Sequence, residues 1–560
     1  MSLCLCVEYL KMKRKVFLFC VLLFFTYPVV ATRYHVNINS GNDAGDGLLW
    51  SSAFKNLQAA LDVAEAGDEI WIAAGVYHPT KKIADVYGTN IHPTTPTHGR
   101  HRSFLINKNI SLYGGFPANP TNATSINSRN WKVHQTVLSG DFNNDDGDNF
   151  ENMDENAFHV VILFDASPLM ILNGLYITGG CADDIGNVYT GDTRYYYVSA
   201  ADGGGLYAYS PNRNSSPTLS DVTFYGNYAR QAGGGLFNFA YQQNASPRIT
   251  NVSFIHNKVE LGHGGGMYNN SAGGIHAELV NINVIGNESW LSGGGLYFFS
   301  IEECAPTIIN SVVSGNYAGY GNGGGICMYT FDGNAEPVIL NTTICGNRVA
   351  KGGSKDGGGL VIWPLGISKA TIINTVIWGN KGDDIDNFFA EGDAGTDNII
   401  RGSFIEGRDD LDDTNLSGNI DPQFLLPAHA DYAPTMDGDY QLKLGSPLID
   451  KGINRFNTLS NDLLGNPRVV DGVIDIGAYE SQGKPPVSND IFNTEKVIWG
   501  NEGTLFVQLH HASSLYVYSI DGKLVRHYKS LNEGLYQFYL PSGIYFVTLN
   551  NGIVEKVIIR

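Results

Sequence analysis

GGGLYAYSPNRNSSPTLSDVTFYGNYARQAGGGLFNF, residues 203–239, is the stretch from which the fold of this chain can be worked out. It begins and ends with three glycines followed by a leucine and an aromatic residue. Such triplets start at residues 203, 233, 264, 293, 323 and 357, so the repeat is close to thirty residues long. A fixed period of this length is typical of solenoids and propellers, in which each repeat packs on its neighbours.

Two series of polar residues keep step with the triplets. The first series is Asp221, Asn251, Asn281, Asn310, Asn341 and Asn374, and each member is followed six residues later by Asn227, Asn257, Asn287, Asn316, Asn347 and Asn380. Around the first series, apolar residues alternate over three-residue segments, which are too short for propeller blades but suit the sides of a coil. The sequence therefore predicts an all-β solenoid, a parallel β-helix whose strands stack about 4.8 Å apart.

The polar series and the glycines are expected at the corners of the coil. Asn and Asp accept a positive φ more readily than other residues with a side chain. Stacked carboxamides can also bond to one another from rung to rung, as in other cross-β ladders, so we expect the first series to form a structural ladder. The glycine triplets are expected where backbones approach closely and φ is unusual.

These repeats resemble those of the right-handed β-helix proteins of the pectin-lyase-like superfamily. The pairing of GGG-[LIM] with F-x-x-N, as in Phe224–Asn227 and Phe254–Asn257, is also similar to the repeats of polymorphic outer-membrane adhesins. Residues 442–452 and 462–480 resemble the closing region of the surface proteins called choice-of-anchor Q. The resemblance spans about residues 33–480. It implies a right-handed coil and says little about activity.

The N-terminal residues predict export. Residues 1–31 contain a basic stretch, an apolar run too short to cross a bilayer and a small-residue cleavage site at Val29-Val30-Ala31, which together are typical of a cleaved signal peptide. After removal of the signal, no transmembrane segment is expected. A membrane anchor is the alternative.

The β-helix is predicted over residues 32–480, with a cap at each end. Ser51 or Ser52 is a plausible N-cap for an amphipathic helix that carries Phe54, Leu57, Leu61 and Ala64 on one face and stops at Gly67. Such a helix would cover the open strand edges at the start of the coil. At the far end, we expect Arg468 to pair with Asp450 or Asp475.

A different region follows the coil. Residues 481–490 form a polar linker with a Pro-Pro pair, and residues 491–560 contain hairpin signals around Asp521-Gly522 and Asn551-Gly552, which predict a small β-sandwich. This region resembles the C-terminal sorting domain of the type IX secretion system of Bacteroidetes. The resemblance implies recognition by the secretion machinery and a secreted or cell-surface, outer-membrane location. An ordinary accessory β-domain is the alternative.

Composition narrows the function classes. The formal net charge of −19 disfavours nucleic acid and anionic lipid as partners, and a hydrophobic content of 43% is too high for a disordered chain. Outside the signal, Cys181, Cys304, Cys327 and Cys345 are too scattered for a disulfide framework, although they leave room for one bridge whose partners the spacing does not identify.

The outward positions that follow each triplet are rich in aromatic residues. If Leu206 and its equivalents point inward, the next position and the one two further on point outward and form two columns along one face. Their aromatic members are Tyr207, Phe237, Tyr268 and Tyr297 in the first column, and Tyr209, Phe239, Phe299, Tyr329 and Trp363 in the second.

Exposed contiguous aromatics usually mark an interaction surface, and sugar rings stack on aromatic faces. In the pectin-lyase-like proteins that the chain resembles, the corresponding face is the glycan groove. The sequence thus predicts an adhesin or glycan-binding protein whose partner is a polysaccharide, or a host or cell-surface glycan or protein. Alternatively, loops cover the columns, or the columns only stabilise the coil by stacking.

Catalysis has weaker support. The acids nearest this face, Glu302, Glu303, Asp332 and Asp356, do not recur in a column as a hydrolase pair or a calcium cluster would require. His263, in a GHG motif, occupies a slot that other repeats fill with unrelated residues, which favours a solvated loop residue. We expect no chemistry and no required cofactor. A polysaccharide lyase or glycoside hydrolase is the alternative.

One acidic loop has the spacing of a calcium site. DFNNDDGDNFEN, residues 141–152, places Asp141, Asn143 and Asp145 as oxygen ligands would be placed. Glycine falls at the seventh position instead of the sixth, and no Glu stands at the twelfth. The loop therefore predicts either a bound Ca²⁺ or a solvated acidic turn.

Overall fold

The computed structural model describes residues 31–82, 89–91, 99–184, 187–190, 197–351, 357–383 and 387–482, and then 498–501, 504–509, 513–519, 523–532, 534–541, 543–549 and 554–559. Nearly all of the predicted signal peptide and most of the predicted linker lie outside these residues. The chain divides into two compact units, residues 1–481 and 482–560.

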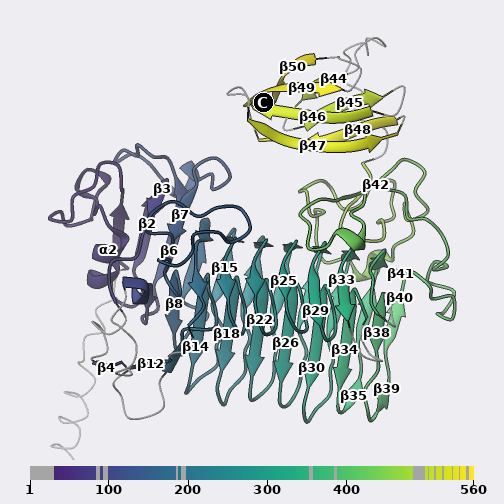
Figure 1. Ribbon diagram of the computed structural model, residues 1–560, viewed down its shortest axis with the longest axis horizontal. Coiled ribbons are helices and arrows are strands. Elements are labelled where there is room, and N and C mark those ends of the chain that lie inside the picture. Colours follow the sequence, from purple (N-terminus) through teal and green to yellow (C-terminus); the bar gives the residue numbers. More distant parts are fainter. Residues whose placement is uncertain are drawn as a thin grey trace, which may run out of the picture. The chain divides into compact units, whose positions relative to one another are not determined.

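The first unit is a parallel β-helix, as predicted, with its rungs side by side along the coil (Figure 1). Sheet 1 contains, in spatial order, β1 (Arg33–Val36), β2 (Glu69–Ala73), β6 (Ser111–Phe116), β9 (Ile171–Asn173), β15 (Thr218–Ser220), β19 (Arg248–Thr250), β23 (Glu278–Val280), β27 (Thr307–Ile309), β31 (Val338–Leu340), β36 (Thr371–Ile373) and β40 (Ile399–Arg401). Most of these strands are three residues long, the length that the repeat predicts.

Two further long sheets and a short one complete the coil. Sheet 2 contains β3 (Gly75–Tyr77), β7 (Thr136–Ser139), β10 (Leu175–Thr178), β16 (Thr223–Tyr225), β20 (Ser253–Ile255), β24 (Asn283–Ile285), β28 (Val312–Ser314), β32 (Thr343–Cys345), β37 (Val376–Trp378) and β41 (Phe404–Ile405). Sheet 3 contains β5 (Phe104–Ile106), β8 (Val161–Phe164), β14 (Leu206–Ser210), β18 (Leu236–Ala240), β22 (Met267–Ser271), β26 (Leu296–Ser300), β30 (Ile326–Thr330), β34 (Leu360–Pro364) and β38 (Phe388–Ala390). Sheet 4 contains β11 (Cys181–Ala182), β17 (Tyr228–Ala229), β21 (Lys258–Val259), β25 (Glu288–Ser289), β29 (Tyr317–Tyr320) and β33 (Arg348–Lys351).

Among the described residues of the first unit, three smaller groups of paired strands lie outside the four sheets of the coil. They are the antiparallel group of β4 (Thr89–Ile91), β12 (Asn187–Thr190) and β13 (Tyr197–Ser199), the parallel pair of β35 (Ile367–Ser368) and β39 (Gly395–Thr396), and the antiparallel pair of β42 (Phe424–Leu426) and β43 (Asp439–Leu442).

The predicted structural ladder stands at the corner between sheets 1 and 2. Asp221, Asn251, Asn281, Asn310, Asn341 and Asn374 all have a positive φ, between 48° and 57°. The Nδ2 atoms of Asn251 and Asn281 donate to the side-chain oxygen of the preceding rung at 3.0 Å, and that of Asn310 does so at 2.7 Å. We call these six residues the corner ladder. Both physical reasons for its composition, the backbone angle and the side-chain bonds, are therefore confirmed.

The second polar series is buried inside the coil. Asn227, Asn287 and Asn316 have no exposed surface, and each donates its Nδ2 to the Oδ1 of the asparagine in the next rung at 2.8–3.0 Å. Their Oδ1 atoms also accept backbone N–H groups, as Asn287 does from Asn257 at 3.0 Å. Since a buried peptide group without a partner is costly, these carboxamides replace sheet bonds where the chain turns.

The glycine triplets allow the chain to fold back on itself. Gly233 has a φ of 60°, and a Cβ on it would lie 2.4 Å from the carbonyl oxygen of Leu236. A Cβ on Gly234 or Gly235 would lie 2.6 Å from a carbonyl oxygen of the next triplet. Neighbouring triplets therefore stack so closely that no side chain fits between them, which explains why all three positions are glycine.

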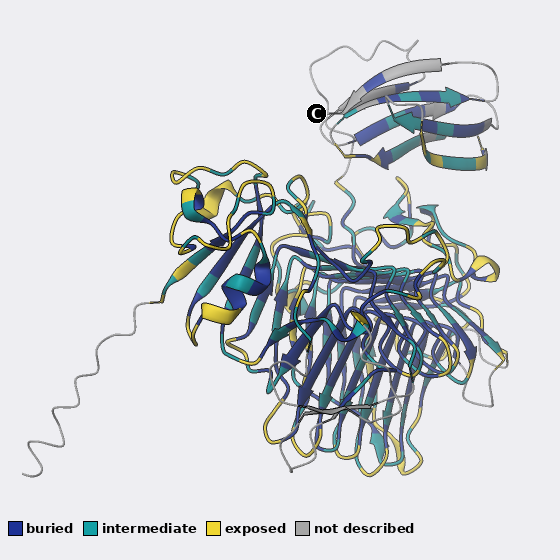
Figure 2. Ribbon diagram, turned by 60° about the vertical axis from the view of Figure 1, so that its left-hand side comes forward, coloured by how far each residue is buried: buried dark blue, intermediate teal, exposed yellow. Residues whose placement is uncertain are grey.

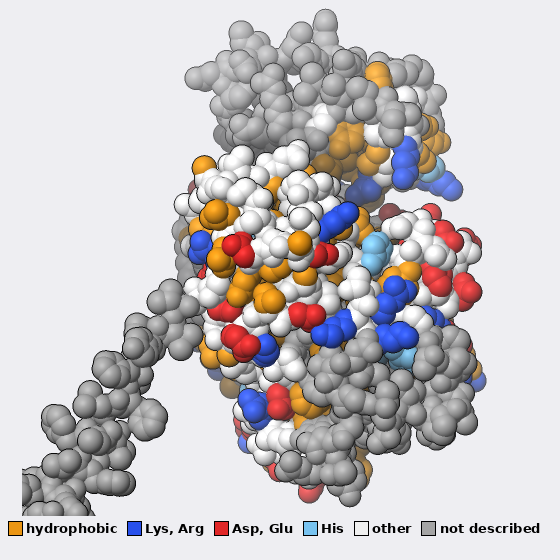
Figure 3. All heavy atoms as spheres, turned by 90° about the vertical axis from the view of Figure 1, so that its left-hand side faces the viewer, with side chains coloured by type: hydrophobic (Ala, Val, Ile, Leu, Met, Phe, Trp, Pro, Cys, Tyr) orange, Lys and Arg blue, Asp and Glu red, His pale blue; other side chains and the backbone are white. Residues whose placement is uncertain are grey.

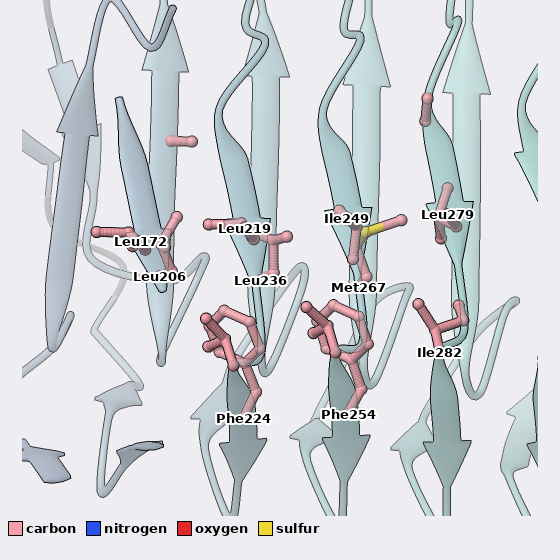
Figure 4. Close-up of a cluster of buried hydrophobic side chains, with 14 of the residues drawn as sticks. Leu172, Leu206, Leu219, Phe224, Leu236, Ile249, Phe254, Met267, Leu279 and Ile282 are labelled. Carbon is pink, nitrogen blue, oxygen red and sulfur yellow. The ribbon is translucent and has the colours of Figure 1, made fainter. Parts of the chain in front are cut away.

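Apolar side chains fill the inside of the coil in columns (Figure 4). Leu206, Leu236 and Met267 of sheet 3 face Leu219 and Ile249 of sheet 1 across the interior. The rings of Phe224 and Phe254 stack with centroids 5.1 Å apart. Each such side chain contributes about 1.5–3 kcal/mol through burial, and the contribution recurs in every rung. The strands are buried while the connecting loops carry most of the exposure (Figure 2).

A helix covers the start of the coil, but it is shorter than predicted. A 3₁₀ turn at Trp50–Ser52 precedes α2 (Leu57–Val63), whose N-cap is Asn56 rather than Ser51 or Ser52. The predicted apolar face is correct, because Phe54, Leu57, Leu61 and Ala64 are all buried in the main core. The helix starts later because Asp43 accepts hydrogen bonds from the backbone N–H groups of Lys55 and Asn56, each at 2.8 Å.

Residues 424–480, which we call the closing region, pack over the outer face of sheet 2. Phe424, Tyr440 and Leu448 join Val312 and Val376 in one buried cluster. The two 3₁₀ turns of this region are η4 (Ala430–Tyr432) and η5 (Asn454–Phe456). This packing covers the outer face of the sheet from β28 onward.

The predicted partner of Arg468 is wrong. Arg468 is fully buried, its guanidinium lies 3.8 Å from a carboxylate oxygen of Glu480, and it donates to the backbone carbonyls of Asp475 and Gly477. The Asp475 carboxylate instead accepts the backbone N–H of Asp450 at 2.8 Å. Burial raises the pKa of Glu480 to about 7, while the guanidinium acts in the opposite direction.

The second unit contains two antiparallel sheets, in agreement with a small β-sandwich. One contains β44 (Ile498–Asn501), β45 (Thr504–Leu509) and β48 (Gly534–Tyr539); the other contains β46 (Ser513–Ser519), β47 (Leu524–Leu531), β49 (Gly543–Leu549) and β50 (Val554–Ile559). β46 pairs with β47 and β49 with β50, as the two hairpin signals predict. The turn residues Asp521-Gly522 and Asn551-Gly552 lie outside the described residues.

Three properties of the described part of the chain bear on the other predictions. Cys181, Cys304, Cys327 and Cys345 are buried and unpaired with one another. No helix there is both long and apolar enough to cross a membrane. At the end of the first unit that carries α2, acidic and basic side chains are interspersed with apolar ones (Figure 3).

Candidate functional site

The outer face of sheet 3 is built as the alternation predicts. Tyr207, Phe237, Tyr268 and Tyr297 are in register on neighbouring strands, followed by Cys327. Two residues further along each strand, Tyr209, Phe239, Asn270, Phe299, Tyr329 and Trp363 form the second column. We call these the inner column and the outer column.

The expectation that both columns are exposed is wrong for the inner column. Tyr207, Phe237 and Tyr297 are 2%, 5% and 7% exposed. The chain just before each triplet folds back over them: Ala232 forms bridges with Asp202 and His263, and Ala232 packs in one cluster with Tyr207 and Phe237. The positive φ of the first glycine permits this reversal. The inner column is therefore part of a second, outer layer of core.

His263 belongs to this cover, so its assignment as a solvated loop residue is wrong. Its ring stacks on Tyr297 with centroids 4.4 Å apart, and its Nδ1 accepts the backbone N–H of Ser292 at 3.2 Å. Burial lowers its pKa to about 4. His159, which lies 5.2 Å from Tyr207 between ring centroids, is 2% exposed, and burial lowers its pKa to about 4 as well. Both rings are neutral at neutral pH.

The outer column remains accessible over most of its length. Tyr209 is buried, whereas Phe239, Phe299, Tyr329 and Trp363 are partly exposed. Phe299 stacks on Tyr329 at 5.8 Å, and Trp363 meets Tyr329 edge-on at 5.5 Å. The Trp363 Nε1 donates to the Asp393 Oδ1 at 3.0 Å, which holds the indole in place. Asn270 divides the column into two aromatic segments.

A third row, not among the predicted site residues, extends this surface. Tyr241, Ile301 and Phe331 follow their strands immediately and are 45%, 40% and 58% exposed. They lie two residues beyond the outer column, so the same alternation points to them. We define the aromatic stripe as Phe239, Tyr241, Phe299, Tyr329, Phe331 and Trp363. Its members come from four rungs of a rigid sheet, those of β18, β26, β30 and β34, so their spacing is fixed by the backbone.

The acids considered as catalysts lie beside the stripe. Glu303 is paired with His276, whose Nε2 lies 3.7 Å from its Oε2, and Glu302 and Asp332 are exposed. Asp356 lies outside the described residues. Asp332 lies in the rung next to Glu302, because its backbone N–H donates to the carbonyl of Ile301 at 2.7 Å, so the expectation that these acids do not recur from rung to rung is wrong for this pair.

The acidic loop gathers a different set of ligand atoms from the predicted set. Oxygens of Asp141, Asp145 and Glu155 lie within 4.8 Å of one another, the only such group of three among the described residues. Asn143 contributes its backbone N–H to Asp141 at 3.2 Å and to Glu155 at 3.4 Å. Burial, together with these neighbouring carboxylates, raises the pKa of Asp146 to about 6. The arrangement offers hard oxygen donors of the kind that Ca²⁺ prefers.

Comparisons with known proteins do not assign the chain to a family. No family model and no curated protein matches the chain. Similar solved structures include a pectate lyase, "Crystal structure of pectate lyase Pel9A", with a TM-score of 0.43 and 12% identity over 81% of this chain and 97% of that one.

Another is "Rhamnogalacturonan lyase", with a TM-score of 0.26 and 12% identity over 70% of this chain and 91% of that one. A third is "The complex structure of XylC with xylose", with a TM-score of 0.28 and 12% identity over 80% of this chain and 99% of that one. At this similarity they carry no information about activity. The parallel β-helix architecture rests on the stacked parallel sheets and the corner ladder of this chain.

Proposed function

We propose that this protein is an exported β-helix protein that binds glycans through the aromatic stripe and acts as an adhesin or glycan-binding protein. The observation that carries the proposal is the contrast on sheet 3, where one aromatic column is covered and the stripe is left open. Accessible aromatic side chains held at fixed positions on a rigid sheet are what recognition of a repeating sugar chain requires, because pyranose rings stack on aromatic faces.

Export supports the same role. The signal-like N-terminus and the antiparallel second unit fit delivery to the cell surface or the medium through a C-terminal sorting domain, as the type IX resemblance implies. In a Bacteroidetes host, deletion of residues 491–560 should then keep the protein inside the cell. Secretion of the truncated protein would contradict a role of this unit in sorting, and the unit would then be an ordinary accessory β-domain.

Binding at the stripe is tested on a glycan array. The wild-type protein should bind at least one polysaccharide, and Tyr329→Ala with Trp363→Ala should weaken that binding by more than tenfold, since one stacked ring contributes about 1 kcal/mol or more. Trp290→Ala is the matched control, because Trp290 is 47% exposed in a different row of the coil.

Two results would overturn the proposal: no binding by the wild type, or equal binding by the stripe variant. Release of unsaturated or new reducing ends from any polysaccharide would replace it with the alternative, a polysaccharide lyase or glycoside hydrolase.

Calcium is a second, structural proposal for the acidic loop. Ca²⁺ held by Asp141, Asp145 and Glu155 would offset their mutual repulsion and stabilise the loop. Addition of millimolar Ca²⁺ should raise the melting temperature of the wild type, EDTA should lower it again, and Asp145→Asn should remove the effect. A melting temperature that is the same with Ca²⁺ and with EDTA would exclude the ion.

A further inference from the structure

The outer edge of the corner ladder is covered at both ends of the coil and open in between. Toward the C-terminal end, Asn374 donates to the carbonyl of Ile453 at 3.2 Å and accepts its N–H at 2.7 Å. Asn341 donates to the Oδ1 of Asn457 at 3.2 Å, and Asn310 donates to the carbonyl of Asn461 at 3.4 Å. The closing region thus follows the ladder for three rungs and then turns away.

The other end of the ladder is covered by the loop between β6 and β7. The Arg129 guanidinium donates to both the backbone and the side-chain oxygen of Asn173, one rung before Asp221. Between Asn173 and Asn310 stand the rungs of Asp221, Asn251 and Asn281. Over these three rungs lies a groove of about 520 Å³, which is within the usual range for ligand clefts of about 300–1,000 Å³.

The groove has a periodic floor and two fixed walls. One wall contains Trp131, Lys132 and Gln135, and the other is the turn at residues 461–465. The floor is formed by Asp221, Asn251 and Asn281 of the corner ladder and, beside them, by the first residues of β16, β20 and β24, namely Thr223, Ser253 and Asn283. The floor therefore presents a carboxylate and a hydroxyl at the first rung, a carboxamide and a hydroxyl at the second, and two carboxamides at the third, with the rungs about 4.8 Å apart.

The floor accepts and donates hydrogen bonds but carries little charge. Asp221 is already bonded through both oxygens, to Asn251 at 3.0 Å and to Asn173 at 3.3 Å, and burial raises its pKa. Lys132 provides one positive charge at the rim. Asp462, on the far wall, is 3% exposed and bonded to the backbone N–H groups of Leu464 and Asn466. The lining thus gives a charged ligand no strong counter-charge.

We infer that this groove is a second binding site, for a neutral oligosaccharide chain. Hydroxyl groups donate and accept at once, so they match a floor of carboxamides and hydroxyls. Short polar side chains at a constant spacing match a polymer of identical units better than a peptide, whose side chains vary. Trp131 and Tyr176, both partly exposed at the groove, provide aromatic surfaces for the sugar rings. The site is separate from the aromatic stripe and does not depend on it.

The probes are cellohexaose, xylohexaose and mannohexaose, with hexagalacturonate as the charged counterpart, titrated into the full chain by calorimetry. At least one neutral hexasaccharide should bind, and hexagalacturonate should bind at least tenfold more weakly at the groove. Asn283→Ala and Trp131→Ala should each weaken the neutral binding at least fivefold. Asn283 points outward from β24 and is not part of the corner ladder, so its replacement should leave the fold intact, with an unchanged melting temperature as the check.

The stripe variant Tyr329→Ala with Trp363→Ala is the matched control and should change groove binding less than twofold. Loss of binding in the stripe variant alone would assign the sugar to the stripe and overturn the groove. The groove is also overturned if no neutral hexasaccharide binds at millimolar concentration, if Asn283→Ala and Trp131→Ala bind like the wild type, or if a synthetic peptide of residues 453–461 binds there in preference to every sugar.

Discussion

The inner and outer columns of sheet 3 differ in one respect, the chain that lies over them. Both arise from the same alternation after the glycine triplets, both are aromatic, and both are stacked by the same strand register. The inner column is buried beneath the residues before each triplet, while most of the outer column is accessible. An aromatic residue at an outward position is therefore not enough to identify a binding residue, since the neighbouring loop decides whether it packs or binds.

The largest expected effect is on the stability of the protein when a residue of the covered inner column is replaced. Tyr297→Ala should lower the free energy of unfolding by about 3 kcal/mol, because it leaves a cavity between His263, Tyr268 and the strand below. Glycan binding at the stripe should stay within twofold of the wild type. Urea denaturation and the array together check this. A stable Tyr297→Ala variant that has lost binding would reverse the roles of the two columns.

A second test uses pH. The folded-state pKa of His159 and His263 is lowered to about 4 from an unfolded value of 6.5. Their contribution to stability is therefore complete above about pH 6.5 and is lost as the pH falls toward 4, by on the order of 2–3 kcal/mol for each histidine. His263→Phe keeps the stacked ring and should reduce this pH dependence in denaturation curves at pH 7.5, 6 and 5. An equal slope in wild type and variant would mean that the fold does not hold the His263 ring neutral.

The smallest expected effect on stability comes from replacing residues of the aromatic stripe. Tyr329→Ala with Phe331→Ala should change the free energy of unfolding by less than about 1 kcal/mol, since exposed side chains contribute little to the folded state. The melting temperature gives the readout. A loss as large as that of Tyr297→Ala would show that the stripe, too, is structural.

The sequence was sufficient for the repeating parts of the fold. Period, strand length, corner residues and strand register all follow from local rules that apply again in each rung, as the positive φ of Asn251 and Asn281 shows. The hairpins of the second unit follow from alternation and turn residues in the same way.

The contacts made by the segments that surround the coil could not be predicted from the repeat. The burial of Tyr207 and Tyr297 depends on how the chain before each triplet folds back, and the groove depends on where residues 461–465 leave the corner ladder. The helix starts later because of Asp43, which lies outside the helical pattern, and Arg468 pairs with Glu480 instead of the predicted Asp450 or Asp475. The contacts of residues 461–465, Asp43 and Arg468 each occur at one place in the chain, so the repeat does not reveal them.

The central claim is that the uncovered aromatics of sheet 3 hold a sugar chain, and a crystal structure with an oligosaccharide taken from the array tests it most directly. The account predicts sugar rings stacked on Tyr329, Phe331 and Trp363, with the inner column still covered. A sugar bound only elsewhere on the molecule, with the stripe bare in the same crystal, would contradict it.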